Sequence, residues 1–161
     1  MTGHGIITVL RTADATVGKR MVEITKATYD EICSYLFNTP AECGGVLGGR
    51  DGEAISVFCF DRTGSSSPEE YTPDYITING ILDEWSADEI QMLGIIHSHN
   101  GNDSMPSCGD LYYCEQILLA NDMLDEFLLP IALPDKRTID LYVCSLQNAH
   151  IRIRKDNFCI I

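Results

Sequence analysis

The chain has 161 residues, of which 45% are hydrophobic, and a formal net charge of −13 at pH 7. This length and composition are typical of one globular domain that buries its own core. The negative charge argues against nucleic-acid binding and against binding to anionic membranes, and no apolar run reaches the roughly 18 residues of a membrane span. We therefore expect a single domain over residues 1–161, with a poorly defined N-terminal segment over residues 1–20.

The N-terminus and the cysteines indicate a cellular compartment. The first residues have no basic region and no long apolar block, so they do not look like a signal peptide. The seven cysteines are odd in number, form no Cys-x-x-Cys pair and fall mostly in apolar or helical positions. Reduced cysteines in a cytoplasmic protein fit this pattern better than disulfides do.

Hydrophobic patterns predict the first elements. Ile6–Leu10 is a candidate short strand, Gly18–Arg20 a turn, and the alternating stretch Met21–Ile24 a second strand. Thr25 is suited to capping a helix that ends before Pro40. Its apolar stripe recurs at helical spacing and comprises Tyr29, Ile32, Cys33, Leu36 and Phe37.

A glycine-rich strand follows, beginning at Glu42. Its glycines are not a phosphate loop, because no Gly-Lys-Ser/Thr follows them. We expect them to let another backbone, or a substrate chain, come close. Asp51–Gly52 predicts a hairpin turn, and Ala54–Phe60 the return strand.

The sequence of the middle of the chain predicts a loop, a helix and a strand. Residues 61–71 are polar and include three consecutive serines, which predicts a loop that could act as a mobile flap. Pro73–Asp74 begins a helix whose packing face carries Ile78, Ile81, Leu82 and Trp85. Residues 92–96 form an apolar run that predicts a buried strand over residues 91–96.

The C-terminal third predicts a helix, a strand and a hairpin. The helix runs from Ser107 to about Ala120, and the strand covers Phe127–Leu133. Strands over 138–146 and 149–154 form the hairpin, with its turn at Gln147–Asn148 and His150 on the surface. Three helices interspersed with some seven strands indicate an α/β or α+β fold.

Polar residues with metal-binding chemistry gather where the 91–96 strand ends. Side chains two apart on a strand share a face, so His97 and His99 present two imidazoles together and Ser98 points the other way. Ser107 and Asp110 stand at capping-box spacing, with Asp in place of Glu. Asp110 thus lies on the first helical turn, from which it can reach the strand end.

Two histidines and one carboxylate make a three-ligand zinc site with a fourth position left for water, the catalytic kind of zinc site. The alternative is a pair of hydrogen-bonded histidines beside an ordinary helix cap. Cys108 lies next to these residues in sequence, but we expect its thiol to point away.

At these positions the sequence resembles the JAMM (also MPN or JAB) zinc metallopeptidases. Their pattern is an upstream Glu, then His-x-His, seven residues, Ser, two residues and Asp, and it is matched here by His97, His99, Ser107 and Asp110. Residues 42–49 resemble the Glu-x-Gly-Gly-x-Leu-x-Gly strand of bacterial members, with Glu42 as the upstream acid. The chain departs from the family at position 100, which holds Asn where Pro is usual. The resemblance extends from about residue 21 to about residue 154.

The resemblance implies a fold and roles for the site residues. It implies a cytidine-deaminase-like architecture, a curved mixed sheet with packed helices. Zn²⁺ would be held by His97, His99 and Asp110, with Glu42 as general base and Ser107 donating a hydrogen bond to the oxyanion. The simpler alternatives are a solvated strand-end carboxylate for Glu42 and a plain helix cap for Ser107.

The implied function is hydrolysis of a peptide or isopeptide bond near the C-terminal Gly-Gly tail of a ubiquitin-like or sulfur-carrier protein. If the protein has this function, we expect the glycine-rich strand and the loop from His97 to Asp110 to form a narrow groove for the tail. Two alternatives stay open: a non-catalytic scaffold of the same fold, and a zinc hydrolase of a small-molecule amide. A deaminase is disfavoured, because neither His-x-Glu nor Pro-Cys-x-x-Cys occurs.

Overall fold

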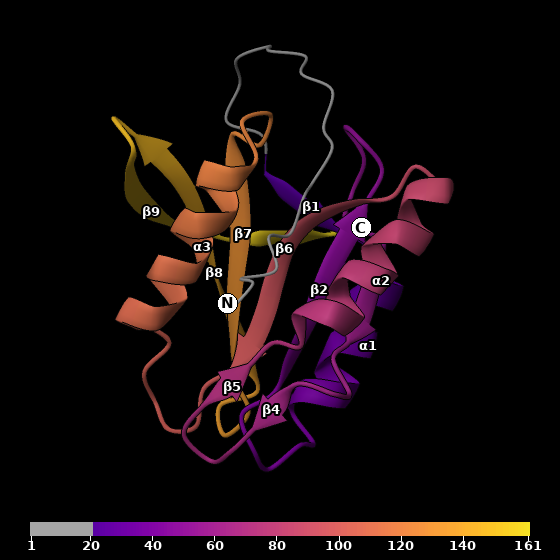
Figure 1. Cartoon of the computed structure of the whole chain (residues 1–161). Coiled ribbons are helices and arrows are strands. Elements are labelled where there is room, and N and C mark those ends of the chain that lie inside the picture. The colour runs from indigo at the N-terminus through magenta and orange to yellow at the C-terminus, as the bar shows by residue number, and fades with distance from the viewer. Residues whose placement is uncertain (1–20) are drawn as a thin grey trace.

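A mixed six-stranded sheet forms the centre of the computed structural model, which describes residues 21–161 (Figure 1). Its strand order is β3-β2-β6-β7-β8-β9, in which β6 and β7 are parallel and the other neighbours antiparallel. The strands are β2 (Gly44–Gly49), β3 (Val57–Phe60), β6 (Gln91–Ser98), β7 (Glu126–Leu133), β8 (Thr138–Gln147) and β9 (His150–Asp156).

Helices cover both faces of this sheet. Residues of α2 (Tyr75–Ala87) and α3 (Cys108–Ala120) share one core cluster, and residues of α1 (Lys26–Leu36) belong to the other (Figure 1). Thr25, Asp74 and Ser107 cap the three helices, each accepting a backbone N–H on its side chain. The expected mixed α/β fold class, with three helices packed on a mixed sheet, is confirmed.

Strand alternation decides which face carries polar chemistry. On β6, Ile95 packs in the α2 and α3 core, whereas Ile96 packs in the α1 core. His97 therefore follows Ile95 toward α2 and α3, and Ser98 follows Ile96 toward α1.

Two small ladders lie outside the central sheet. β1 (Val22–Ile24) pairs in parallel with β10 (Phe158–Ile160), and β10 had no counterpart among the predicted strands. β4 (Ser65–Ser66) pairs with β5 (Tyr71–Thr72). The prediction of a loop over residues 61–71 is confirmed for most of the segment, but Ser65, Ser66 and Tyr71 belong to this two-stranded ladder, whose strands are too short and polar to give a periodic signal.

Several predicted boundaries shift for local reasons. The return strand begins at Val57 and not at Ala54, because the backbone of Ile55 bonds instead to Glu23 and Thr25 at the end of β1. The β8–β9 turn lies one residue later than expected, at Asn148–Ala149, where both residues have positive φ. The predicted strand Ile6–Leu10 and turn Gly18–Arg20 lie outside the described residues.

The cysteines form no disulfide, as the sequence predicted. All seven cysteines are free, and Cys108 is exposed. Among residues 21–161, no helix is long and apolar enough to cross a membrane. His150 is exposed at the start of β9, as expected.

Candidate metal centre

The end of β6 places the two histidines on one side of the sheet. His97 pairs with Gly44 of β2, and the backbone N–H of His99 donates to the carbonyl of Ala132 at 2.9 Å. Ser98 lies on the opposite side, fully buried, where its hydroxyl accepts the backbone N–H of Cys43 at 3.1 Å. The predicted division of these side chains between the two faces is confirmed.

The N-terminus of α3 brings the carboxylate to the histidines. Ser107 Oγ accepts the backbone N–H of Asp110 at 3.1 Å, and Asp110 Oδ2 accepts the backbone N–H of Ser107 at 2.7 Å. This is the predicted capping box, completed with Asp. It fixes the Asp110 carboxylate on the first turn, facing β6.

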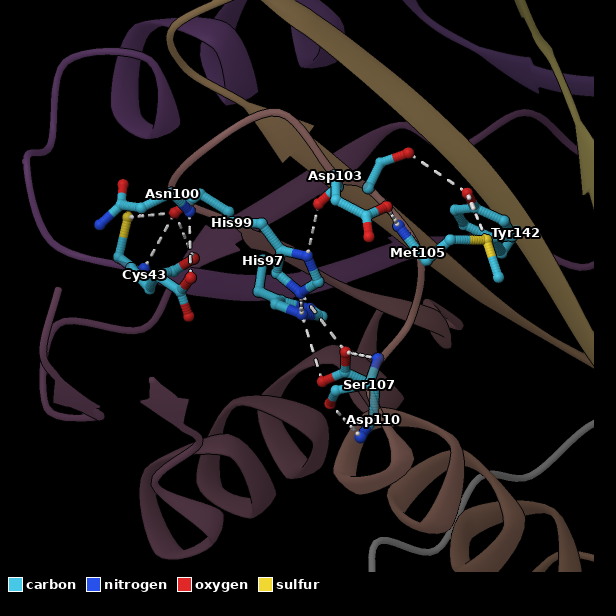
Figure 2. Close-up of polar contacts among 12 residues, drawn as sticks. Cys43, His97, His99, Asn100, Asp103, Met105, Ser107, Asp110 and Tyr142 are labelled. Atoms are coloured by element: carbon cyan, nitrogen blue, oxygen red, sulfur yellow. Dashed lines mark hydrogen bonds and ion pairs between the residues drawn. The ribbon is translucent and has the colours of Figure 1, made fainter. Parts of the chain in front are cut away.

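Three donor atoms converge at this point (Figure 2). The two Nε2 atoms of His97 and His99 are 3.0 Å apart, and the Asp110 oxygens lie 3.2 and 3.4 Å from them. Ligands about 2.0–2.2 Å from a tetrahedral zinc ion are separated by roughly 3.3–3.6 Å. The donor spacing is within a few tenths of an ångström of that arrangement, so these residues fit zinc.

A backbone contact sets the tautomer of one imidazole. Nδ1 of His99 lies 3.2 Å from the carbonyl oxygen of Asp103 (Figure 2). When Nδ1 donates its proton there, Nε2 carries the lone pair that a metal requires. The loop is anchored in turn, because the buried Ser104 hydroxyl donates to Asp140 and lies 3.2 Å from the Tyr142 hydroxyl.

The same contacts shift two pKa values. Burial by itself would raise the pKa of Asp110, but hydrogen bonds from His97 and His99 outweigh it and hold that pKa well below its usual range. Burial would lower the pKa of His99, yet its contacts with Asp110 and with the Asp103 carbonyl raise it on balance. In the metal-free protein the cluster therefore holds the Asp110 carboxylate ionised and favours a proton on His99, which a bound metal ion would displace.

Glu42 lies just before β2 and is 8% exposed, so it is not a solvated carboxylate. Its Oε1 accepts the backbone N–H of Asn100 at 3.0 Å, and its own backbone N–H donates to Ser67 at 2.9 Å. The Asn100 side chain in turn donates to the carbonyls of Pro40 and Pro68. The residue that departs from the family pattern therefore orients Glu42 through a backbone N–H that proline lacks.

One cavity of about 390 Å³ brings these groups together. It is lined by Glu42, both histidines, Asn100, Ser107 and Asp110, together with Ile95, Gly109, Tyr113 and Leu129 and with residues of the β5 segment and the start of α2, Glu69–Pro73 and Tyr75. Cys108 is neither in this lining nor in the donor cluster.

The cavity wall differs from the expected groove. The glycine-rich strand β2 is buried along its whole length and does not line the cavity. At Gly45, Gly48 and Gly49 an added Cβ would meet other parts of the same chain, including the Trp85 ring at 2.5 Å from the Cβ on Gly48. The expectation that these glycines let another backbone come close is confirmed at Gly45 and Gly49, where a backbone carbonyl lies nearest, whereas the predicted substrate groove along this strand is not found in the cavity lining.

Sequence reasoning missed the wall residues. Tyr71 and Tyr75 come from β5 and the start of α2, and no local pattern separates them from ordinary polar or packing residues. Of the adjacent pair after the motif, Tyr113 lines the cavity and Tyr112 is exposed. Helical periodicity gives this distinction, because Tyr113 shares its face with Ile117.

Comparison with known proteins gives a family and a fold. Residues 25–145 match the family model described as prokaryotic homologs of the JAB domain. No curated protein matches. The chain is similar to a protein from Desulfitobacterium hafniense solved in solution, at 19% identity over 88% of this chain and 94% of that one, with a TM-score of 0.63. A JAB1/MPN domain protein from Archaeoglobus fulgidus matches at 13% identity over 88% and 100% of the chains, with a TM-score of 0.48.

Proposed function

The chain belongs to the family of prokaryotic JAB-domain proteins, and on that basis we propose that it is a zinc-dependent peptidase. The observation that carries the proposal is the shared cavity, which holds a three-donor group at zinc spacing and a buried carboxylate outside that group. A scaffold domain requires neither feature. A closed structural zinc site would have four protein ligands and no open side.

The site residues divide the chemistry between them. His97, His99 and Asp110 would hold the ion, which when bound acts as a Lewis acid that makes water more acidic and polarises a carbonyl. Glu42 is the general base: its carboxylate takes a proton from the attacking water and gives one to the leaving amine. Its hydrogen bond from Asn100 fixes the direction in which the carboxylate points.

Ser107 can stabilise the oxyanion without giving up its cap. A hydroxyl has one donor hydrogen and two acceptor lone pairs, and capping the Asp110 N–H uses only a lone pair. The hydrogen stays free to donate to an oxygen in the cavity that Ser107 lines. Cap and oxyanion donor are therefore compatible roles for this one side chain.

We expect Ser107→Ala to lower kcat by about 100-fold or more with little change in KM, because the lost hydrogen bond strengthens only in the transition state. Steady-state kinetics on a cleaved substrate measures both constants. The matched control is Thr25→Ala, which removes an equivalent cap from α1, far from the cavity. Loss of stability in both variants with unchanged kcat in both would leave Ser107 as a cap alone.

We propose that the substrate is the C-terminal tail of a ubiquitin-like or sulfur-carrier protein, in the cytoplasm. Support comes from the family resemblance and from the shape of the wall: β5 pairs only with β4 among the described strands, and its two residues line the cavity. An extended tail can add to such an edge through main-chain hydrogen bonds. A cavity of this volume also fits a small molecule, which keeps a small-amide hydrolase as the second candidate.

We expect cleavage of a ubiquitin-like carrier that bears extra residues after Gly-Gly, and at least tenfold slower cleavage when Val-Val replaces Gly-Gly. Branched residues beside the scissile bond would meet the ring-lined wall, whereas glycine has no Cβ. Mass spectrometry of the products gives both rates and the cleaved bond. Equal rates on the two carriers, or turnover of a small amide alone, would argue for the second candidate.

A further inference from the structure

The Tyr71 ring stands beside a metal-ligand candidate at the cavity wall. The ring centroids of Tyr71 and His97 are 6.4 Å apart and their planes are inclined by 26°, which is within the spacing of interacting aromatic pairs. Three other residues surround the tyrosine: Gly44 of β2, and Asp61 and Gly64 from the turn before β4. We call these three residues the Tyr71 slot.

Two glycines leave room for the ring. A Cβ on Gly44 would lie 2.6 Å from Cε1 of Tyr71, and a Cβ on Gly64 would lie 2.8 Å from Cε2. Both distances are shorter than the 3.0 Å that real Cβ contacts keep. The two sides of the ring are therefore covered by backbone, and Gly44 of the glycine-rich strand packs against the chain's own tyrosine.

A buried carboxylate holds the hydroxyl. Asp61 is 3% exposed, and its Oδ2 accepts the Tyr71 hydroxyl at 2.7 Å and the backbone N–H of Asp74 at 2.9 Å. Its Oδ1 accepts the backbone N–H of Gly64 at 2.9 Å. Burial and the Asp61 hydrogen bond raise the pKa of Tyr71 well above its usual range, so the hydroxyl stays a donor committed to Asp61.

We propose that Tyr71 is a positioning residue of the metal centre, which sets the orientation of the His97 imidazole from its slot. It acts through His97 and not on the substrate, and the inference rests on the proposed metal-dependent function. A ligating imidazole must aim its lone pair at the ion, and partners that fix this direction are worth about 10–100-fold in metal affinity. For His99 the Asp103 carbonyl provides such a partner. For His97 the partner that fixes the imidazole is the packed ring of Tyr71.

The first test measures zinc affinity by competition with a chromophoric chelator. We expect Tyr71→Leu, which removes the ring, to weaken zinc binding about 10–100-fold, and Tyr71→Phe, which keeps it, to stay within about threefold of wild type. The matched control is Tyr75→Leu, the same change on the same cavity wall, where the tyrosine packs against Tyr113 at 5.6 Å between centroids. Its affinity should also stay within about threefold.

A second test needs no metal. We expect the imidazole NMR signals of His97 in the metal-free protein to move in Tyr71→Leu but to keep their positions in Tyr71→Phe and Tyr75→Leu. If wild type binds no zinc, the proposed function fails, and the His97 signals alone decide the inference. Unchanged His97 signals in a folded Tyr71→Leu variant, or zinc affinity equal to wild type, would overturn it.

Gly64→Ala displaces the ring without touching either histidine. The added Cβ meets Asp61 Oδ2 at 2.5 Å and the Tyr71 ring at 2.8 Å. We expect the same direction of change in zinc affinity and in the His97 signals as for Tyr71→Leu. If Tyr71→Leu does not fold, Gly64→Ala replaces it in both tests. Zinc affinity and His97 signals equal to those of wild type in Gly64→Ala would then contradict the proposal.

Discussion

Glu42→Gln is expected to reduce hydrolysis by at least about 100-fold while leaving the fold and zinc binding intact. The amide keeps the shape of the side chain, and its oxygen can still accept the N–H of Asn100. What it loses is the ability to take a proton. Glu42 is also outside the three-donor group, so zinc content should not change. The measurement is initial cleavage rate at equal zinc loading.

The control for this variant is Glu70→Gln, which neutralises an exposed carboxylate on the wall of the same cavity. Its rate should stay within a few-fold of wild type. If Glu42→Gln turns over at a similar rate, another group is the base. If both variants lose activity together, the negative charge of the cavity matters more than proton transfer.

Asp110→Ala is expected to weaken zinc binding by more than about 100-fold. Losing a residue that only orients a metal ligand costs about 10–100-fold, and losing a ligand itself should cost more. The variant removes one of three converging donors and leaves two imidazoles with no carboxylate between them. Zinc at 100 times its Kd should stabilise wild type by about 2.7 kcal/mol and this variant by almost nothing. Thermal unfolding with and without zinc measures the difference.

The matched control here is Asp103→Ala. The Asp103 side chain accepts the backbone N–H of Met105 at 2.9 Å, while its main-chain carbonyl contacts His99. This variant should keep its zinc and its stabilisation by zinc. Equal zinc content in wild type and Asp110→Ala would remove Asp110 from the ligand set, leaving the capping box as its role.

Local rules were enough to predict that the side chains of His97, His99 and Asp110 converge. Strand alternation places His97 and His99 together, and the capping box places Asp110 on the first helical turn. Both rules act over a few residues, so neither depends on how the sheet is ordered. The same holds for the start of α2 at Asp74, where a proline and a capping side chain come together.

The cavity wall could not be predicted, because it depends on contacts between distant segments. Glu42 is oriented by Asn100, 58 residues away, and the β4–β5 hairpin is tied to the site through Asp61. The parallel pair of β1 and β10 joins the two ends of the described chain in the same way. Propensity carries no information on such pairings. Glycine likewise indicates that another chain segment comes close, but it does not say whether that segment belongs to the protein or to a substrate.

We propose that this cavity hydrolyses a peptide bond only when the His97, His99 and Asp110 group holds one zinc ion. The most direct measurement is a titration of metal-free protein with zinc, followed by cleavage of a carrier extended beyond Gly-Gly. We predict no cleavage without zinc, and a cleavage rate that rises linearly with added zinc until one zinc ion is present per chain. Undiminished cleavage by the metal-free protein, or no cleavage of any amide at full zinc loading, would contradict the claim.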